Sequence, residues 1–318
     1  MKNAVVIGLG SISSFHIDAI LNCANLYGVC DVDIKKADDI SQKYKCKVFY
    51  DINDAVNDEN VDTVHICTPH YLHFKQAKLA AEHGKDIVLE KPATIDINDY
   101  YELLKIVKAK NIKCMICLQN RYNPCVAYIK NNDLNLGNVL GVKGILTWKR
   151  TPEYYTSSNW RGKWQTEGGG LLINQAPHTL DLLAYFGGDL IEVKGTISRR
   201  VLNGVIEVED TAEATLYFKN GVKGIFYGTT GHADNSSYDL EIVYENGVLR
   251  YIFGKLLLIK DGDIRVLCND AHIEGEKAYW GRSHNVIIAN YYQDGEYPHL
   301  EDYEKTAIIL DKLLKNRI

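Results

Sequence analysis

The chain has 318 residues, of which 46% are hydrophobic and 24% are charged, and its formal net charge is −5. A domain usually holds about 100–200 residues, so this length predicts two domains. The composition excludes a disordered, collagen-like or disulfide-rich chain. No hydrophobic run approaches the roughly 18–20 residues that cross a bilayer, and the first residues lack the pattern of a signal peptide. We therefore expect a cytoplasmic protein with no membrane partner.

Two further compositional features narrow the class. Lys and Arg number 36 against 41 Asp and Glu, and the densest basic stretch, Lys43–Lys47, holds only three lysines. This argues against nucleic acid as a partner. The eight cysteines are scattered through hydrophobic segments and are expected to be free thiols. Cys114 and Cys117 form a C-x-x-C pattern within a strand-like segment, where side chains three apart point to opposite faces. The sequence therefore predicts no metal site.

The first 120 residues alternate between strand-like and helix-like segments. The expected strands are Ala4–Ile7, Leu26–Cys30, Val61–Cys67, Asp86–Leu89 and Ile112–Leu118. The expected helices are Ser14–Leu21, Ile34–Tyr44, Leu72–His83 and Asp96–Lys110. This alternation predicts an α/β domain, residues 1–120, with a parallel sheet that helices cover on both faces.

After residue 121 the strand-like segments follow one another directly. They are Val139–Lys149, Val193–Arg200, Glu207–Phe218, Val222–Gly228 and Leu240–Tyr244, and helices are expected near Asn174–Tyr185, Ser283–Tyr292 and Asp302–Lys315. Two of the joints contain Asn-Gly pairs, which favour hairpins. The pattern predicts a second, α+β domain, residues 121–318, with an open and mostly antiparallel sheet. We expect the two domains to abut with a cleft between them.

The first strand is followed by a glycine-containing turn that suggests dinucleotide binding. The turn reads Gly8-Leu9-Gly10-Ser11-Ile12-Ser13 and leads directly into the first helix. Such a turn brings backbone and helix N–H groups to a pyrophosphate. Asp31 follows the second strand 18 residues after Ser13, close to the spacing of a ribose-binding acid. A carboxylate there favours NAD, whereas Lys35 and Lys36 keep NADP possible. The alternative is a tight turn without a ligand, and Ser13 in place of Gly or Ala could loosen helix–strand packing.

Two later strands also end in polar segments. Cys67-Thr68-Pro69-His70-Tyr71-Leu72-His73 follows one of them, and Glu90-Lys91-Pro92 follows another. Ligands of open α/β sheets bind at this edge. We expect His70 to be a surface residue at the start of a helix. For Glu90 and Lys91 the alternative is an ordinary loop ion pair.

A glycine-rich segment opens the helical part of the second domain. Gly168-Gly169-Gly170 allows close packing against a flat ligand. Asn174, His178 and Asp181 follow at a spacing that places them on one face of a helix. From the sequence alone, a hydrogen-bonded core residue is an equally good interpretation of His178.

These four segments together resemble the Gfo/Idh/MocA oxidoreductases over essentially the whole chain, in the family's order and spacing. The resemblance implies a Rossmann domain followed by a domain whose open sheet commonly forms a homodimer or homotetramer. Lys91 takes the place of the family's catalytic lysine, and His178 that of its catalytic histidine. Asn174 stands where inositol dehydrogenase-like members carry an aspartate. The pair Asn174-Gln175 resembles the branch that acts on nucleotide sugars and related sugars, which modestly favours a pyranoside over free inositol.

The resemblance also implies an activity: hydride transfer between NAD(P) and a hydroxyl or ketone carbon of a sugar, nucleotide sugar or related polyol. We expect His178 to remove the hydroxyl proton and Lys91 to hold the same oxygen. The expected cofactor-binding residues are Gly8, Gly10, Ser11, Ile12, Asp31, Thr68, Pro69, His73, Glu90 and Lys91. The expected substrate-binding residues are Lys91, Arg121, Tyr155, Trp160, Arg161, Asn174 and His178, of which Lys91, Asn174 and His178 are also expected to be catalytic.

Several alternatives stay open. The aromatic residues that precede the glycines (Tyr154, Tyr155, Trp160 and Trp164) either line the substrate pocket or pack the domain junction. Arg121 either faces the cleft or forms a structural ion pair, and Gln175, Asp181 and His284 are expected in supporting roles only. The alternative functions are a cyclitol dehydrogenase, an aldose or ketose reductase, and a regulator that binds NAD(P) without turnover.

Overall fold

The computed structural model describes residues 1–236, 239–270 and 283–316. The chain divides into two compact units, of which residues 1–119 with 282–304 form the first and residues 120–281 with 305–318 the second. We expected the segment 282–304 in the second domain. It belongs to the first unit because helix α10 (His284–Tyr292) packs against helix α1 (Ser13–Cys23). The first unit is therefore discontinuous in sequence.

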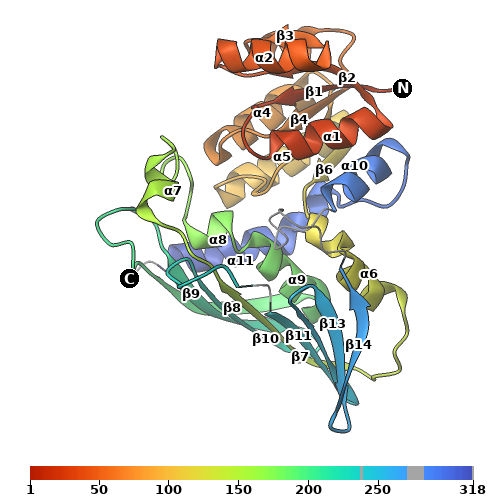
Figure 1. The fold of residues 1–318 in the computed structure, drawn as a ribbon, viewed down its shortest axis with the longest axis vertical. Coiled ribbons are helices and arrows are strands. Elements are labelled where there is room, and N and C mark those ends of the chain that lie inside the picture. Colours follow the sequence, from red (N-terminus) through yellow and green to blue (C-terminus); the bar gives the residue numbers. More distant parts are fainter. Residues whose placement is uncertain (237–238, 271–282, 317–318) are drawn as a thin grey trace. The chain divides into compact units, whose positions relative to one another are not determined.

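The first unit contains a six-stranded sheet in which every pairing is parallel. Its strands are β1 (Asn3–Ile7), β2 (Asn25–Cys30), β3 (Lys47–Phe49), β4 (Thr63–Ile66), β5 (Asp86–Leu89) and β6 (Cys114–Ile116), in the order β3-β2-β1-β4-β5-β6 (Figure 1). The strand order reverses between β1 and β4, and ligands of such sheets bind beyond the carboxyl ends of the strands at this point. The Rossmann topology is thus confirmed, and β3 is a strand that the sequence analysis did not name.

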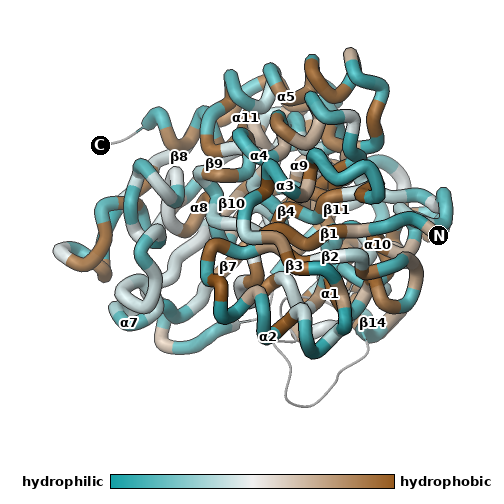
Figure 2. Tube along the Cα trace, turned by 90° about the horizontal axis from the view of Figure 1, so that it is seen from above, coloured by the Kyte–Doolittle hydropathy of each residue, from teal (hydrophilic) through white to brown (hydrophobic). Residues whose placement is uncertain are grey.

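The other helices of the first unit are α2 (Ile34–Tyr44), α3 (Ile52–Asn57), α4 (His70–Glu82) and α5 (Ile97–Lys110), with a 3₁₀ turn at Leu300–Tyr303. Aspartates at the starts of α2, α3 and α5 cap the first turn, since the carboxylates of Asp33, Asp51 and Asp96 accept backbone N–H groups. Figure 2 shows brown, hydrophobic stretches along β1 and mostly teal ones on α2, as expected for a buried strand and a surface helix.

The second unit contains an eight-stranded sheet. Its strands are β7 (Val139–Thr147), β8 (Leu190–Ser198), β9 (Thr211–Phe218), β10 (Lys223–Thr229), β11 (Asp239–Tyr244), β12 (Gly247–Ile252), β13 (Lys255–Lys260) and β14 (Asp263–Asn269). The spatial order is β14-β13-β12-β11-β7-β10-β9-β8, with β7 and β10 parallel and the other neighbours antiparallel. The expected open, mostly antiparallel sheet is confirmed, and the sequence analysis missed its last three strands.

The helices of the second unit are α6 (Pro124–Asn131), α7 (Pro152–Thr156), α8 (Leu171–Asn174), α9 (Pro177–Gly187) and α11 (Glu304–Lys315), with a 3₁₀ turn at Gln119–Tyr122. Helix α9 packs on β7, β10 and β11. The approach is close at Gly144 of β7, where an added Cβ would lie 2.7 Å from Thr179 Cγ2. Alternate residues of β10 point away from this core, and Ile225 and Tyr227 among them are exposed.

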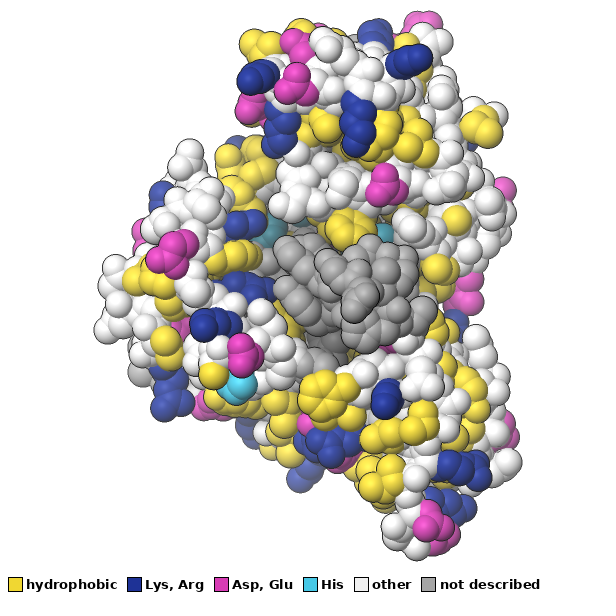
Figure 3. All heavy atoms as spheres, viewed as in Figure 1, with side chains coloured by type: hydrophobic (Ala, Val, Ile, Leu, Met, Phe, Trp, Pro, Cys, Tyr) yellow, Lys and Arg dark blue, Asp and Glu magenta, His cyan; other side chains and the backbone are white. Residues whose placement is uncertain are grey.

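The surface and the cysteines agree with the expected type of protein. On the face drawn in Figure 3, dark blue Lys and Arg side chains lie among magenta Asp and Glu side chains. All eight cysteines are free thiols, and five of them are buried. Among the described residues, the helices are too short or too polar to serve as a membrane span.

Candidate active site

The turn after β1 packs against the end of β4. Gly8 has a φ of +86°, and an added Cβ would lie 2.7 Å from Thr68 Cγ2 and 2.9 Å from the Thr68 backbone. Gly10 is in the opposite situation, since an added Cβ would meet no atom of the described chain within 4 Å. The hydroxyl of Ser13 is buried and donates to the carbonyl of Gly10 at 2.7 Å. Ser13 therefore fastens the turn to α1, contrary to the loosening that we considered.

Asp31 lies at the end of β2, next to this turn. Its Oδ2 accepts the Leu9 N–H at 2.7 Å and its Oδ1 accepts the Asp33 N–H at 2.9 Å, while Lys36 Nζ is 3.5 Å from Oδ2. A carboxylate offers about four acceptor positions, so Asp31 retains capacity for two ribose hydroxyls. The open side of Gly10 and the residues that lead into α1, Ser11 and the N-cap Ile12, provide room and N–H groups for a pyrophosphate. The residues at this edge fit a dinucleotide.

His73 joins the two other turns at the same edge. Its Nδ1 lies 2.7 Å from the Pro92 carbonyl and its Nε2 lies 2.9 Å from the Thr68 carbonyl. Both ring nitrogens are thus used within the protein, so His73 supports a cofactor site by holding the turns together. Pro69 directly precedes α4, and His70, its first residue, is buried. The expectation that His70 is a surface residue is therefore wrong, because its ring packs edge-on against His73.

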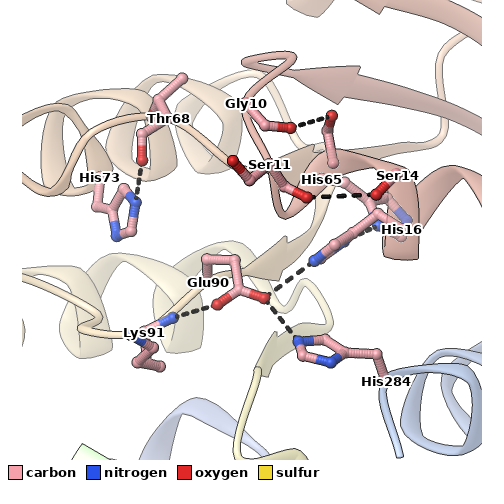
Figure 4. A network of polar contacts seen from close by, with 11 residues as sticks. Gly10, Ser11, Ser14, His16, His65, Thr68, His73, Glu90, Lys91 and His284 are labelled. Atoms are coloured by element: carbon pink, nitrogen blue, oxygen red, sulfur yellow. Dashed lines mark hydrogen bonds and ion pairs between the residues drawn. The ribbon is translucent and has the colours of Figure 1, made fainter. Parts of the chain in front are cut away.

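Glu90 follows β5 and is buried beside two histidines (Figure 4). Its Oε1 lies 3.0 Å from His16 Nε2 and 3.0 Å from His284 Nε2, and its Oε2 accepts the backbone N–H of Lys91 at 3.2 Å. Burial opposes ionisation of Glu90, but the hydrogen bonds and charges of His16 and His284 outweigh it and hold the pKa well below its ordinary value. Glu90 is thus a buried anion that fixes the backbone of Lys91, and the alternative of an ordinary loop ion pair is wrong.

The contacts of Glu90 extend into a larger network. His16 Nδ1 lies 2.9 Å from His65 Nδ1, and His65 Nε2 lies 2.7 Å from the hydroxyl of Tyr292. The thiol of Cys117 is also close to Glu90 and shares its buried surroundings. The sequence analysis did not name His16, His65, Cys117 or Tyr292 as site residues, because they come from separate elements and no local spacing connects them.

In the second unit, the glycine-rich segment packs against its own chain. An added Cβ at Gly170 would lie 2.0 Å from the Glu209 carbonyl oxygen. The buried Glu209 carboxylate accepts the N–H groups of Gly170 and Leu172, both at 2.9 Å, and so caps helix α8. We expected a flat ligand to pack closely against these glycines. At Gly170 it is instead the backbone of Glu209, in the segment before β9, that packs there.

Asn174 is bonded to a carboxylate that the sequence analysis did not identify. Its Nδ2 donates to Glu167 Oε1 at 2.6 Å and lies 3.3 Å from the hydroxyl of Tyr154. Glu167 is fully buried, and its Oε2 accepts the N–H of Gly162. Burial raises the pKa of Glu167 to about 7, although the bonds from Asn174 and Gly162 oppose the shift. The Asn174 amide thus lies beside the carboxyl group of Glu167, seven residues earlier in the chain.

His178 lies in the first turn of α9, and only 7% of its surface is exposed. The expected single helix through Asn174, His178 and Asp181 is interrupted, since α8 ends at Asn174 and α9 begins at Pro177, which has no N–H to continue the first helix. Asp181 instead accepts two bonds of 2.8 Å from the guanidinium of Arg121. For Arg121 the geometry is that of the structural ion pair.

The aromatic residues before the glycine-rich segment make two kinds of contact, with a hydrophobic cluster and with arginine side chains. Tyr155 is buried in a hydrophobic cluster with Leu202, Ile206 and Val208, against which Tyr154 and Trp164 pack. The expectation that Tyr155 contacts substrate is therefore replaced by a packing role. The guanidinium carbons of Arg161 and Arg150 lie 4.3 Å and 5.0 Å from the centre of the Tyr154 ring, and Arg161 is also 5.4 Å from that of Trp160.

Comparison with known families gives matches over both units. The model of the oxidoreductase family with an NAD-binding Rossmann fold matches residues 2–117, and that of the GFO/IDH/MocA C-terminal domain matches residues 132–250. The chain belongs to the Gfo/Idh/MocA family of oxidoreductases. The NAD-binding Rossmann description applies to the domain that carries the Gly8 turn, in agreement with the fit found at that edge.

Curated members of the Gfo/Idh/MocA family are similar to parts of the chain. Levoglucosan dehydrogenase of Pseudarthrobacter phenanthrenivorans is 28% identical over 218 residues, which are 60% of this chain and 55% of the relative. UDP-N-acetylglucosamine 3-dehydrogenase of Acidithiobacillus ferrooxidans is 30% identical over 144 residues, 45% of each protein. The match thus spans about half the length of these relatives.

Solved structures of the same family share the fold over nearly the whole chain. The WlbA dehydrogenase from Bordetella pertussis, in complex with NADH and UDP-GlcNAcA, has a TM-score of 0.83 at 24% identity and covers 99% of this chain and 96% of its own. A levoglucosan dehydrogenase in complex with NADH and levoglucosan has a TM-score of 0.85 at 21% identity, with the same coverage.

Proposed function

We propose that the protein is an NAD-dependent dehydrogenase that oxidises a hydroxyl group of a sugar or nucleotide sugar, or reduces the corresponding ketone. The observation that carries this proposal is that a member of an oxidoreductase family has both the residues for binding a dinucleotide and the residues for proton transfer. The first unit has the Gly8 turn with Asp31 and Lys91, and the second has His178 at the start of α9. The named relatives act on levoglucosan and on a UDP-sugar, which supports the substrate class.

The residues at the edge of the first sheet favour NAD over NADP. The Asp31 carboxylate, held by the N–H groups of Leu9 and Asp33, accepts bonds from ribose hydroxyls and repels a 2′-phosphate. Lys36 lies 3.5 Å from this carboxylate and partly offsets its charge, which leaves NADP as the weaker ligand. When bound, the nicotinamide supplies the acceptor or donor of a hydride at the reacting carbon.

The residues of the chain supply proton transfer and charge stabilisation. His178 takes the proton from the hydroxyl that is oxidised and returns it when the ketone is reduced. Lys91, whose backbone is fixed by Glu90, stabilises the negative charge that develops on the substrate oxygen. Asn174 is held by Glu167 and presents an amide to substrate hydroxyls where some relatives present a carboxylate.

The surroundings of Tyr154 favour a substrate with an acidic group. Arg150 and Arg161 both lie over this ring, and the Nε of each is buried without a hydrogen-bond partner in the described part of the chain. Tyr154 in turn contacts Asn174 through its hydroxyl. Arginine binds phosphate and carboxylate groups through paired N–H donors. We therefore favour a nucleotide sugar or a sugar acid over a neutral cyclitol.

The exposed face of the second sheet supports a homodimer or homotetramer. Ile225 and Tyr227 of β10 expose 58% and 37% of their surface, on an open sheet. Exposed hydrophobic residues on such a face are a common contact between copies. Size-exclusion chromatography with light scattering should show an oligomer, and Ile225→Asp should shift it toward monomer. A monomeric wild-type protein contradicts this assignment.

A cytoplasmic location is also proposed, on the basis of the cysteines. All eight are free thiols, and the five buried ones include Cys67 and Cys117 beside Glu90. Free thiols in this number are typical of a reducing compartment, which is also where nicotinamide-dependent metabolism takes place. Fractionation of the native host, with immunodetection of the protein, would test the location.

The experiment for the proposed function is a thermal-shift titration with NAD⁺, NADH, NADP⁺ and NADPH, followed by the preferred dinucleotide with a panel of sugars. A ligand that binds only the folded state stabilises it by RT ln(1 + [L]/Kd). We expect the largest shift with NAD(H) and a further shift with nucleotide sugars or sugar acids. The absence of a shift with every dinucleotide would overturn the proposal, and a further shift with inositols alone would replace the substrate class.

A further inference from the structure

A second group of side chains in the first unit has a chemistry that hydride transfer does not require. It consists of His16, Glu90, Cys117 and His284, which we call the buried His–Glu–Cys cluster. Each residue offers one ligand atom, and the four atoms lie within 4.8 Å of one another. All four side chains are buried, with exposed fractions between 0% and 5%. The cluster is closed to solvent.

The residues of the cluster come from four separate parts of the fold. His16 lies in α1, Glu90 follows β5, Cys117 follows β6, and His284 begins α10. Figure 4 shows His16 and His284 approaching the same Glu90 carboxylate from α1 and from the start of α10. Cys114, in the same strand-like segment as Cys117, is outside the cluster, as expected for side chains three apart on a strand. A ligand bound here would join all four parts.

The spacing of the ligand atoms suits a tetrahedral ion. Bond lengths of about 2.0–2.3 Å to nitrogen, oxygen and sulfur place neighbouring ligand atoms about 3.3–3.8 Å apart. In the structure, Glu90 Oε1 lies 3.0 Å from His16 Nε2 and from His284 Nε2, and the complete set lies within 4.8 Å. These distances bracket the required spacing, so small side-chain adjustments suffice. When the ion binds, bonds from the two imidazole nitrogens to the ion replace their hydrogen bonds to Glu90.

The charges and the surrounding contacts also suit such an ion. A divalent cation bound by the Glu90 carboxylate, a Cys117 thiolate and two neutral imidazoles gives a group with no net charge, which is the form that tolerates complete burial. His16 is supported from behind, since its Nδ1 contacts His65 and His65 contacts Tyr292. Ligating histidines are commonly oriented by a second partner of this kind.

We propose that the buried His–Glu–Cys cluster is a structural site for a zinc-type divalent metal ion. Imidazole and thiolate ligands select zinc and neighbouring transition metals over Mg²⁺ and Ca²⁺. Four protein ligands leave no position for water or substrate, so the ion has a structural role: it fastens α10 to the sheet of the first unit. The site does not depend on the proposed function, and it differs from the sequence-based expectation that the protein has no metal site.

The test measures metal directly and needs neither NAD nor a sugar. The full-length protein is purified without chelators, its metal content is determined by plasma mass spectrometry, and the metal-free protein is titrated with Co²⁺. We expect about one zinc per chain, and with Co²⁺ the visible spectrum of a tetrahedral site together with a thiolate-to-cobalt charge-transfer band. Added Zn²⁺ should remove both signals by competition.

The variants Cys117→Ser and Cys114→Ser form a matched pair, since both thiols are buried in the same short segment. Cys117→Ser should abolish the charge-transfer band, whereas Cys114→Ser should retain the band and the zinc. If Cys117→Ser does not fold, the zinc content and the Co²⁺ titration of the wild-type protein still test the proposal. A wild-type protein that holds no zinc and gives no tetrahedral cobalt spectrum overturns the proposal, as does a charge-transfer band that Cys114→Ser removes and Cys117→Ser leaves.

Discussion

Glu90 in the first unit and Glu167 in the second are both almost completely buried, yet their surroundings favour opposite charge states. Two histidines and a backbone N–H surround the carboxylate of Glu90 and hold its pKa well below the ordinary value. Glu167 is bonded to the Asn174 amide and the Gly162 N–H, and its burial raises the pKa to about 7. Burial thus makes ionisation of both carboxyl groups unfavourable, and the hydrogen-bond partners of each group determine whether it is ionised.

This difference assigns different tasks to the two regions. A carboxylate that stays ionised gives the first unit a fixed charge next to Lys91, suited to positioning. A carboxyl group that titrates near neutrality, beside Asn174, gives the second unit a proton that can move.

The largest effect should follow from removing the proton acceptor of the second unit. His178→Asn keeps a polar side chain of similar size but cannot take the substrate proton, so kcat should fall by about 10²–10⁴-fold. Binding of NADH, assigned to the first unit, should remain within about twofold. His232→Asn, at an exposed histidine of the second unit, is the control and should be active. Wild-type turnover in His178→Asn would exclude His178 as the base.

Substitution by alanine should have different effects at the two glycines of the first turn, on stability at Gly8 and on NAD affinity at Gly10. Gly8→Ala places a Cβ against Thr68 at a positive φ, so the free energy of unfolding should fall by about 1–3 kcal/mol or more. Gly10→Ala meets no atom of the described chain and should leave the stability unchanged, while NAD affinity falls by about tenfold because the methyl group occupies the approach of the pyrophosphate. Denaturant unfolding and calorimetric titration measure the two effects, and equal affinities for NAD in Gly10→Ala and wild type would contradict the cofactor placement.

The same substitution at the two buried carboxylates tests the contrast itself. Glu90→Gln removes an anion that accepts bonds from His16 and His284, so the free energy of unfolding at pH 7.5 should fall by about 2–4 kcal/mol. Glu167→Gln removes a group whose ionisation is unfavourable in the folded state, but its amide nitrogen cannot accept from both Asn174 and the Gly162 N–H. Its loss should therefore be smaller than that of Glu90→Gln, about 1–2 kcal/mol. Equal losses in the two variants would show that burial, rather than the partners, sets the charge.

A smaller effect is expected in the pH dependence of stability. Burial raises the pKa values of Glu167 and Glu209 to about 7, above the value of 4.5 for an unperturbed glutamate. Between these values the unfolded state ionises and the folded state keeps its protons, so these two glutamates should lower the stability as pH rises from about 5 to 7. His16, His65 and His73, whose pKa values burial lowers, act in the opposite direction over the same interval. The decrease should be about 1–3 kcal/mol for each group. Arg161 favours ionisation of Glu167 and limits its share.

Glu167→Gln should therefore lose only the part of the pH dependence that Glu167 contributes. Thermal unfolding of wild type and variant from pH 5 to 8 measures the difference. Identical pH profiles of stability in wild type and Glu167→Gln would contradict the raised pKa of Glu167.

Much of the fold follows from local patterns. The strand–helix alternation predicts the first sheet, and the Asn-Gly pairs at Asn220 and Asn246 predict the hairpins β9–β10 and β11–β12, which are antiparallel. The parallel pairing of β7 with β10 is non-local, and no turn signal announces it. The return of α10 to the first unit is likewise a matter of tertiary packing. Sequence patterns therefore give the elements more readily than their pairing.

The same distinction holds for the candidate site. Glycine turns and strand ends are local features, so Gly8, Asp31, Lys91 and His178 could be named from the sequence. The contacts of Glu90 with His16 and His284 join residues 74 and 194 positions apart, and no spacing rule indicates them. Glu167 was missed because a single Glu before a glycine run has no distinguishing pattern; only its burial identifies it.

The central claim is that the protein moves a hydride between NAD and a sugar-type hydroxyl group, and the direct test is the near-ultraviolet absorbance of NADH. Wild-type protein saturated with NAD⁺ is mixed in turn with nucleotide sugars, sugar acids, neutral sugars and inositols, and the reverse reaction is followed with NADH and the corresponding ketones. We expect a change in NADH absorbance with at least one acidic sugar derivative, and the loss of this change in His178→Asn. Tight NAD binding without an absorbance change for any compound, in either direction, would contradict the account and favour a regulator that binds NAD without turnover.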